Sequence, residues 1–211
     1  MKKSKYVIIV FAIAILLIAY RWAFSDNGSD SKSTDMNSTI TDIMTRSSIR
    51  SYSDSLVSDA QIDTLLRAAM AAPTAGNKQP WRFVVIRDRS ILDSIAANFP
   101  TMTMMKHAPL AVVVCGDTEA TFQGEGVDYW IQDASAATEN LLLAAHAIGL
   151  GAVWCGVCPL SERMGWFSDK LKLPDNILPL NCIAIGYPAG ESRPKDKWHP
   201  EYVHYNTWDA K

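Results

Sequence analysis

Residues 127–156 read VDYWIQDASAATENLLLAAHAIGLGAVWCG, and this stretch predicts the centre of the fold. From Val127 to Ile148 it is rich in alanine and apolar on most helical faces, which is typical of a buried helix. Gly149 is expected to end this helix, since glycine accepts the backbone conformation that follows a last helical turn. A β-strand then begins at Ala152, so a long buried helix runs directly into a sheet.

Helices and strands alternate on both sides of this stretch. Ser58 with Gln61 three residues later forms a capping box, which predicts the start of a helix that Pro73 ends. Apolar runs predict strands at residues 82–86 (a buried strand), 110–115, 152–154 and 181–186, and amphipathic periodicity predicts helices around 91–99 and 161–171. This alternation predicts an α/β sandwich around one sheet.

The N-terminal part of the chain differs from this domain in composition. Residues 1–24 begin with lysines and continue as an apolar run, and residues 6–24 would cover about 28 Å as a helix, close to the thickness of a bilayer core. A membrane anchor is favoured over a cleaved signal peptide, and a buried helix is a third reading. The charge distribution favours an outward-facing domain. Residues 25–39 are polar and predict a flexible linker, so the folded domain is expected at residues 40–211.

Composition and motifs exclude several classes of function. The chain has 211 residues, 20 of them Lys or Arg and 22 Asp or Glu, so its formal net charge of -2 does not favour nucleic acid as a partner. Four cysteines are too few for a disulfide scaffold, and no second ligand pair accompanies the one CxxC to form a zinc site. No phosphate-binding P-loop and no GxSxG motif is present.

The stretch Arg46-Ser47-Ser48-Ile49-Arg50 is a candidate anion site. Two guanidinium groups four residues apart would lie on one side of a helical turn, with two hydroxyls between them. Guanidinium groups match phosphate oxygens, and hydroxyls add hydrogen-bond donors. A basic surface turn is the alternative.

Residues 73–81, PTAGNKQPW, form a second candidate stretch between a helix end and a strand. Asn77 and Gln79 present amide groups that complement the edge of a planar heterocycle. The alternative is a capped turn with Trp81 in the core.

Two further stretches lie beyond the central helix. Gly156 leaves room for a flat ligand against the backbone, whereas Cys155 and Cys158 form a CxxC that is either a dithiol site or a buried apolar pair. In an extended tail, Lys195 and Lys197 would point the same way and form a second cationic clamp, or else remain in solvent. Together the four stretches have the composition of a flavin mononucleotide (FMN) site, in which the cofactor supplies the redox chemistry.

The domain resembles the FMN-dependent nitroreductase family over residues 43–208. The matching stretches are RSSIRSY at residues 46–52, APTAGNKQPW at 72–81, the long helix leading into GLGAVWCG at 149–156, and IGYP at 185–188 followed by Pro194-Lys195. The resemblance implies a three-layer α+β sandwich with a central, mostly antiparallel sheet and a long buried helix. It also implies an obligate homodimer with two FMN sites at the interface.

The resemblance further implies roles for particular residues. Arg46, Ser47, Ser48 and Arg50 would hold the phosphate and ribityl chain of FMN, and Lys195 and Lys197 would close the site. Pro73, Thr74, Ala75 and Asn77 would come from the partner subunit, and Cys155, Gly156 and Val157 would lie along the flavin ring. Similar proteins act by a ping-pong mechanism, in which NAD(P)H delivers hydride to flavin N5 and a nitro compound, quinone or similar acceptor then takes two electrons.

The membrane leader is unusual for such enzymes, because an outward-facing domain would not normally meet NAD(P)H. Either the topology differs from this expectation or another donor reduces the flavin. Two other classes of function also stay open. One is a flavin-binding protein without reductase turnover, for flavin storage or breakdown. The other is a membrane-tethered dithiol protein that uses Cys155 and Cys158.

Overall fold

The computed structural model describes residues 31–208, with side chains from residue 38 onward, and divides the chain into two units at Ile43. The predicted anchor or signal segment, residues 1–24, lies outside the described residues. Among the residues that are described, no helix has the length and apolar character needed to cross a membrane.

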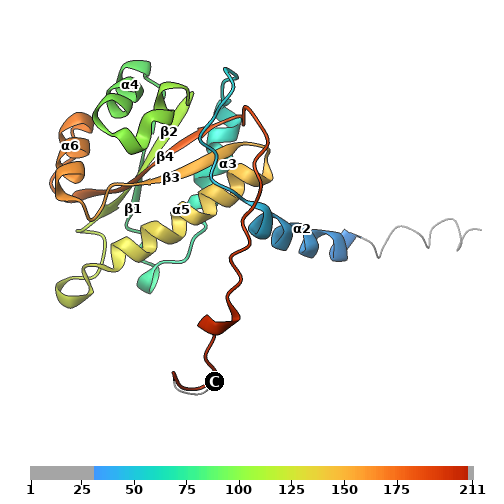
Figure 1. The fold of residues 1–211 in the computed structure, drawn as a ribbon. Coiled ribbons are helices and arrows are strands. Elements are labelled where there is room, and N and C mark those ends of the chain that lie inside the picture. Colours follow the sequence, from blue (N-terminus) through green and yellow to red (C-terminus); the bar gives the residue numbers. More distant parts are fainter. Residues whose placement is uncertain (1–30, 209–211) are drawn as a thin grey trace, which may run out of the picture. The chain divides into compact units, whose positions relative to one another are not determined.

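Five α-helices, four strands and several short 3-10 helices follow one another in the described part of the chain (Figure 1). Their bounds are α2 Ser31–Thr45, α3 Asp59–Met70, η1 Ala75–Asn77, β1 Trp81–Ile86, α4 Arg89–Asn98, η2 Pro100–Lys106, β2 Leu110–Asp117, η3 Gly124–Gly126, α5 Tyr129–Ala147, β3 Gly151–Gly156, α6 Ser161–Leu171, β4 Ile177–Gly186 and η4 Pro200–Tyr202.

Helix α2 overlaps the segment that was predicted to be a flexible linker. Residues 25–39 were expected to be flexible, but Ser31 already begins α2, and the expected domain start at residue 40 falls inside this helix. A helix pairs its backbone groups within itself, so a polar segment can be helical without burying a face. Ile40 and Met44 are accordingly 59% and 71% exposed. Residues 25–30 lie outside the described part.

The four strands form one antiparallel sheet in the order β1-β2-β4-β3, and the family resemblance had implied a mostly antiparallel sheet. The predicted strand at residues 82–86 exists as β1, but its description as buried was wrong. Because β1 lies at an edge of the sheet, Ile86 is the only one of its residues that is buried. Strand β3 forms the opposite edge.

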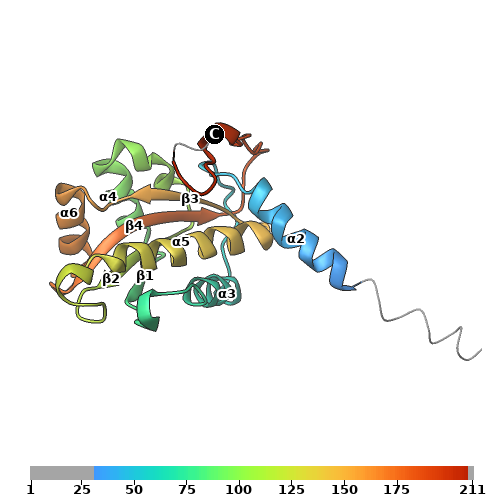
Figure 2. The same ribbon diagram turned by 90° about the horizontal axis from the view of Figure 1, so that it is seen from below.

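Helices cover both faces of this sheet, which confirms the three-layer α+β sandwich (Figures 1 and 2). Alternate residues of β2 point to opposite faces. Val113 and Cys115 join α4, η2 and α6 in one core cluster, whereas Val112 and Val114 join α3 and α5 in the other.

Helix α5 is the long buried helix that the sequence predicted. It packs against α3 and the sheet, and Gly149 follows it with φ of +79°, in the left-handed region that glycine tolerates best. The amide of Leu150 then donates to the carbonyl of Ala145 at 2.8 Å, which turns the chain into β3.

Candidate functional site

Residues 46–53, which we call the strap, pair first with the outer edge of β3 at Ala152 and then with the chain after β4. Ser48 forms a parallel bridge with Ala152, and the amide of Ile49 donates to the Ala152 carbonyl at 3.0 Å. The strap approaches closely because a Cβ at Gly151 would lie only 2.7 Å from the Ile49 side chain. The predicted helical turn at residues 46–50 was therefore wrong, since this backbone pairs with an edge strand instead.

The far end of the strap is held by Tyr52. Its buried hydroxyl donates to the carbonyls of Ile49 and Ala184, at 2.6 and 3.1 Å. The amide of Ser53 donates to the Tyr187 carbonyl at 2.9 Å, and the chain after β4 therefore follows the strap. Ser51 and Ala189 continue this pairing with a 3.0 Å hydrogen bond.

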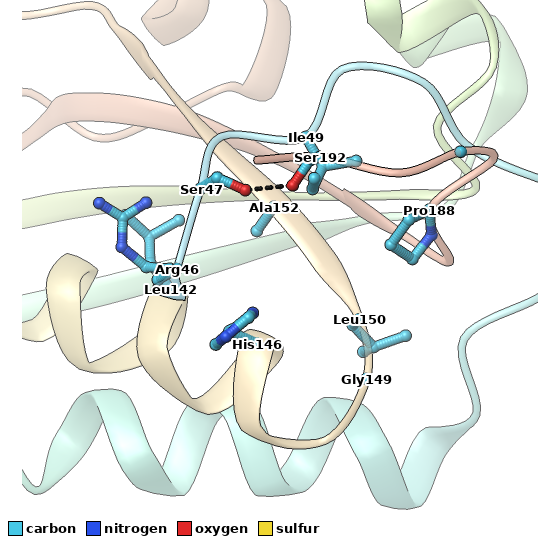
Figure 3. Close-up of a pocket in the computed structure, with 11 residues that line it drawn as sticks. Arg46, Ser47, Ile49, Leu142, His146, Gly149, Leu150, Ala152, Pro188 and Ser192 are labelled. Atoms are coloured by element: carbon cyan, nitrogen blue, oxygen red, sulfur yellow. Dashed lines mark hydrogen bonds between the residues drawn. The ribbon is translucent and has the colours of Figure 1, made fainter. Parts of the chain in front are cut away.

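Two adjoining pockets lie against the strap. The first, of about 230 Å³, is lined by Arg46, Ser47, Ile49, Leu142, His146, Gly149, Leu150, Ala152, Pro188, Gly190 and Ser192 (Figure 3). The second, of about 310 Å³, is lined by Ser48, Ile49, Arg50, Ser51, Gly190, Glu191 and Ser192. A hydrogen bond between the hydroxyls of Ser47 and Ser192 joins the strap to the chain after β4.

Arg46 is the cation of the first pocket. Its side chain is 19% exposed, and its Nε lies 3.1 Å from Oε1 of Glu139 on α5. This ion pair orients the guanidinium group through Nε, and the two terminal nitrogens carry further N–H donors. Arg50 belongs to the second pocket, so the two arginines occupy neighbouring pockets of the extended strap rather than one side of a turn.

Sequence reasoning missed two polar residues of the first pocket, His146 and Ser192. His146 belongs to the last turn of α5, and its Nε2 lies 2.9 Å from the Thr45 hydroxyl oxygen. A signal for it existed, because Glu139 and His146 are two helical turns apart and face the strap together. Ser192 had no such signal, since its place depends on how the chain folds back after β4.

Cys155, Gly156 and Val157 lie at the other end of β3. Gly156 is exposed, and a Cβ placed there would meet no heavy atom within 4 Å. Cys155 is buried, and burial raises the pKa of its thiol to about 11, although the positive charges of Arg50 and Arg163 lower it. Burial also raises the pKa of Cys158. Neither thiol is therefore set up to be a thiolate near neutral pH.

Arg163 on α6 is a further residue that the sequence did not reveal. Its guanidinium donates to the Gly156 carbonyl at 2.9 Å and to the Thr101 hydroxyl at 3.2 Å, and lies over the Phe99 ring. It thus ties the end of β3 to η2 and places a positive charge beside Cys155.

The loop with Pro73, Thr74, Ala75 and Asn77 lines neither pocket. The amide of Ala75 donates to Oδ1 of the buried Asp133 at 2.8 Å, which fixes the loop to α5. Gly76, Asn77 and Gln79 all have positive φ, an unusual density of left-handed backbone. Since Asp133 and His146 are thirteen residues apart on one helix, the loop anchor lies about 20 Å along α5 from the first pocket.

Lys195 and Lys197 do not assemble with the arginines. Both are exposed, and neither lines either pocket. The predicted cationic clamp from the tail is therefore not formed in the described part of this single chain.

Known proteins share this fold. The Nitroreductase family model matches residues 43–100 and 96–187. A protein of Archaeoglobus fulgidus with the provisional name NADH dehydrogenase/NAD(P)H nitroreductase is 44% identical over 169 residues, which are 79% of this chain and 96% of that protein.

Two solved structures superpose on the chain. One, from Parabacteroides distasonis and with the same provisional name, is 43% identical with a TM-score of 0.77, and covers 81% of this chain and 98% of its own. The other, a provisionally named nitroreductase from Desulfovibrio desulfuricans in complex with FMN, is 32% identical with a TM-score of 0.68, and covers 81% of this chain and 97% of its own. The chain belongs to the Nitroreductase family.

Proposed function

We propose that this protein is an NAD(P)H-dependent FMN oxidoreductase. One observation carries the proposal: a strap with two arginines and serines pairs with the edge of β3 at Ala152 and lines two adjoining pockets there. The provisional names of the relatives and the FMN in the Desulfovibrio desulfuricans structure agree with this assignment.

The residues at both ends of this edge fit FMN. At the pocket end, Arg46, Ser47 and Ser48 would bind the phosphate and ribityl chain, with Arg50 further along the strap. From Ala152 to Gly156 the strand covers about 13 Å, and the exposed backbone at its end leaves space for a flat ring. When bound, FMN would supply the two-electron redox chemistry.

The protein would then hold the FMN, orient it and shield it from solvent. Gly151 and Tyr52 fix the strap to the sheet, so that the donors on Arg46 and Ser47 are pre-organised. Cys155 and Val157 are buried and present an apolar, neutral surface. Arg163 donates to the Gly156 carbonyl and adds a positive charge beside the open end of β3.

The open face at Gly156 also suggests the order of events. If donor and acceptor use this one face in turn, the kinetics are ping-pong, with parallel double-reciprocal lines. The proposed acceptors are nitro compounds, quinones or similar two-electron oxidants.

We propose further that the active form is a homodimer. The loop that carries Thr74 and Asn77 is anchored about 20 Å along α5 from the first pocket, so within one chain it does not reach the same ligand end. A second copy would supply Pro73, Thr74, Ala75 and Asn77. Light scattering of the FMN-loaded protein should therefore give twice the chain mass.

For the localisation, composition alone supports a membrane anchor or export signal in residues 1–24, with the domain facing outward. Membrane fractionation of the full chain, before and after deletion of residues 1–24, tests this proposal. If the full chain stays in the soluble fraction and is not shortened, residues 1–24 neither anchor the protein nor act as a cleaved export signal.

Visible spectroscopy of the full-length protein tests the principal function. The purified or FMN-reconstituted protein should be yellow and should bleach with NADH or NADPH, and an acceptor should restore the colour. A flavin-binding protein without turnover would stay yellow in the presence of both nucleotides. A protein that binds no FMN would overturn the assignment.

A further inference from the structure

The first pocket presents an electrostatic problem for a phosphate. A phosphate monoester carries roughly 1.5 to 2 negative charges at pH 7. Arg46 supplies one positive charge, and its ion pair with Glu139 already shares that charge. The pocket also lies at the C-terminal end of α5, where the helix carries partial negative charge. As built from these groups alone, the pocket would bind a phosphate weakly.

The tail lysines do not solve this problem in the described chain. Lys195 and Lys197 are exposed and line neither pocket. Among the residues that line the first pocket, Arg46 and His146 are the two that can carry positive charge. The other ionisable groups nearby are Glu139, which pairs with Arg46, and Arg50 and Glu191 in the adjoining pocket.

His146 is placed where a positive charge has the largest effect. It lies in the last turn of α5, where a cation would oppose the partial negative charge of the helix end. Its Nε2 is held 2.9 Å from the Thr45 hydroxyl, and its ring lies on the same side of the pocket as Arg46 and Leu142 (Figure 3). The ring is thus fixed before any ligand arrives.

We propose that His146 binds the FMN phosphate as an imidazolium, together with Arg46 and with the paired hydroxyls of Ser47 and Ser192. This inference rests on the proposed function, because it assigns a new residue to the same cofactor site. One chain then supplies all the groups proposed to bind the phosphate, because each comes from the strap, α5 or the chain after β4. FMN is thereby distinguished from riboflavin, which lacks the phosphate.

The test compares binding of FMN and riboflavin to the full-length protein by fluorescence quenching. In His146→Phe, which keeps a flat ring but no charge, FMN binding should weaken about tenfold, the range of one lost charged hydrogen bond. Riboflavin binding should stay unchanged. His146→Lys should recover most of the FMN affinity, because it restores a cation in the pocket.

Three outcomes overturn the inference. These are an unchanged FMN affinity in His146→Phe, an equal loss of FMN and riboflavin binding, or no recovery in His146→Lys. A wild-type protein that binds neither ligand overturns the proposed function itself, which keeps the two failures distinct.

A second measurement on the wild-type protein remains available if the variants do not fold. Diethyl pyrocarbonate modifies accessible imidazoles, and peptide mapping reports the extent at each histidine. FMN should protect His146 from modification, whereas riboflavin should not. Equal protection by both ligands, or by neither, contradicts phosphate binding at His146. The exposed His199 serves as an internal control for reagent activity.

Discussion

The two ends of strand β3 are built in opposite ways. At the Gly151 end the strap, α5 and the chain after β4 enclose a pocket with its own charged groups. At the Gly156 end the backbone faces open space, and Arg163 fixes it from one side. Under the proposed function, the first end would hold the phosphate of FMN and the second would receive donor and acceptor.

The loop at residues 73–79 differs from both ends of β3. Its amides are exposed and its backbone is held in left-handed conformations, yet it lies far along α5 from the pocket. Strained and exposed backbone of this kind is common at binding sites. The proposed phosphate end thus lies within one chain, whereas we assign this loop to the FMN site of a second copy.

Valine substitutions at the two glycines give the largest expected contrast. In Gly151→Val the added side chain would collide with Ile49, so we expect the free energy of unfolding to fall by about 3 kcal/mol and the strap to separate from β3. In Gly156→Val stability should change by less than about 0.5 kcal/mol, because nothing lies near the added Cβ. FMN binding should be lost in both variants.

Urea unfolding and FMN titration of both variants measure this contrast. Equal destabilisation of the two variants would mean that the ends of β3 do not differ as described. Normal FMN binding by Gly156→Val would show that the flavin ring does not lie against the open end of β3.

Arg46→Ala tests the enclosed end by itself. It removes a charge-assisted contact with the phosphate, so FMN affinity should fall by about 1.5–3 kcal/mol, measured by equilibrium titration. Glu139→Gln is the matched control, because it removes the partner of Arg46 but leaves the guanidinium in place. That variant should bind FMN at least as tightly as the wild type. Unchanged affinity in Arg46→Ala would refute its phosphate role.

Local patterns in the sequence predicted most of the fold. The Ser58 capping box, the end of α5 at Gly149 and the bounds of α6 are all encoded within a few residues, and all are present. The strap was misinterpreted because two arginines four residues apart suit both a helical turn and an extended segment. Its pairing with Ala152, about a hundred residues away, decides between them and leaves no local trace.

The candidate site was predicted less completely for the same reason. Arg46 and Ser47 stand in a recognisable stretch, whereas His146, Arg163 and Ser192 gain their roles only from tertiary contacts. The clamp of Lys195 and Lys197 was inferred from alternation in the tail, and the tail does not bring them to the pocket.

The thiols of the sheet predict a loss of stability at alkaline pH. Burial raises the pKa of Cys115 to about 12 and that of Cys155 to about 11, above the ordinary value of 9.0. Above pH 9 the unfolded chain ionises these thiols while the folded protein keeps them protonated, so the free energy of unfolding decreases as pH rises. The ionisation of Cys155 alone should lower the free energy of unfolding by about 2 kcal/mol between pH 8 and pH 11.

Urea unfolding over this pH range, with Cys155→Ala as the control, isolates this contribution. The variant should be less stable at pH 8 but should lose less stability on going to pH 11. Parallel pH profiles would contradict a buried, protonated Cys155.

Asp133→Ala tests the element that we assign to the second copy. The Ala75 amide would lose its acceptor, so the free energy of unfolding should fall by about 1 kcal/mol. FMN affinity should fall as well, although Asp133 is remote from the pocket. Asp133→Asn keeps an acceptor oxygen and should show a smaller loss of affinity. Wild-type FMN affinity in Asp133→Ala would show that the loop takes no part in FMN binding.

Cys158→Ser gives the smallest expected effect and decides between a flavin and a dithiol. A dithiol mechanism needs both sulfurs of the CxxC, so this single change would abolish it. A flavin reductase should keep its turnover within about twofold, since Cys158 lines neither pocket and its raised pKa keeps it a thiol. Stopped-flow bleaching by NADH, followed by reoxidation with a quinone, measures both half-reactions. If Cys158→Ser loses both half-reactions while FMN is still bound, the cysteine pair at the open end of β3, and not the cofactor, carries out the reaction.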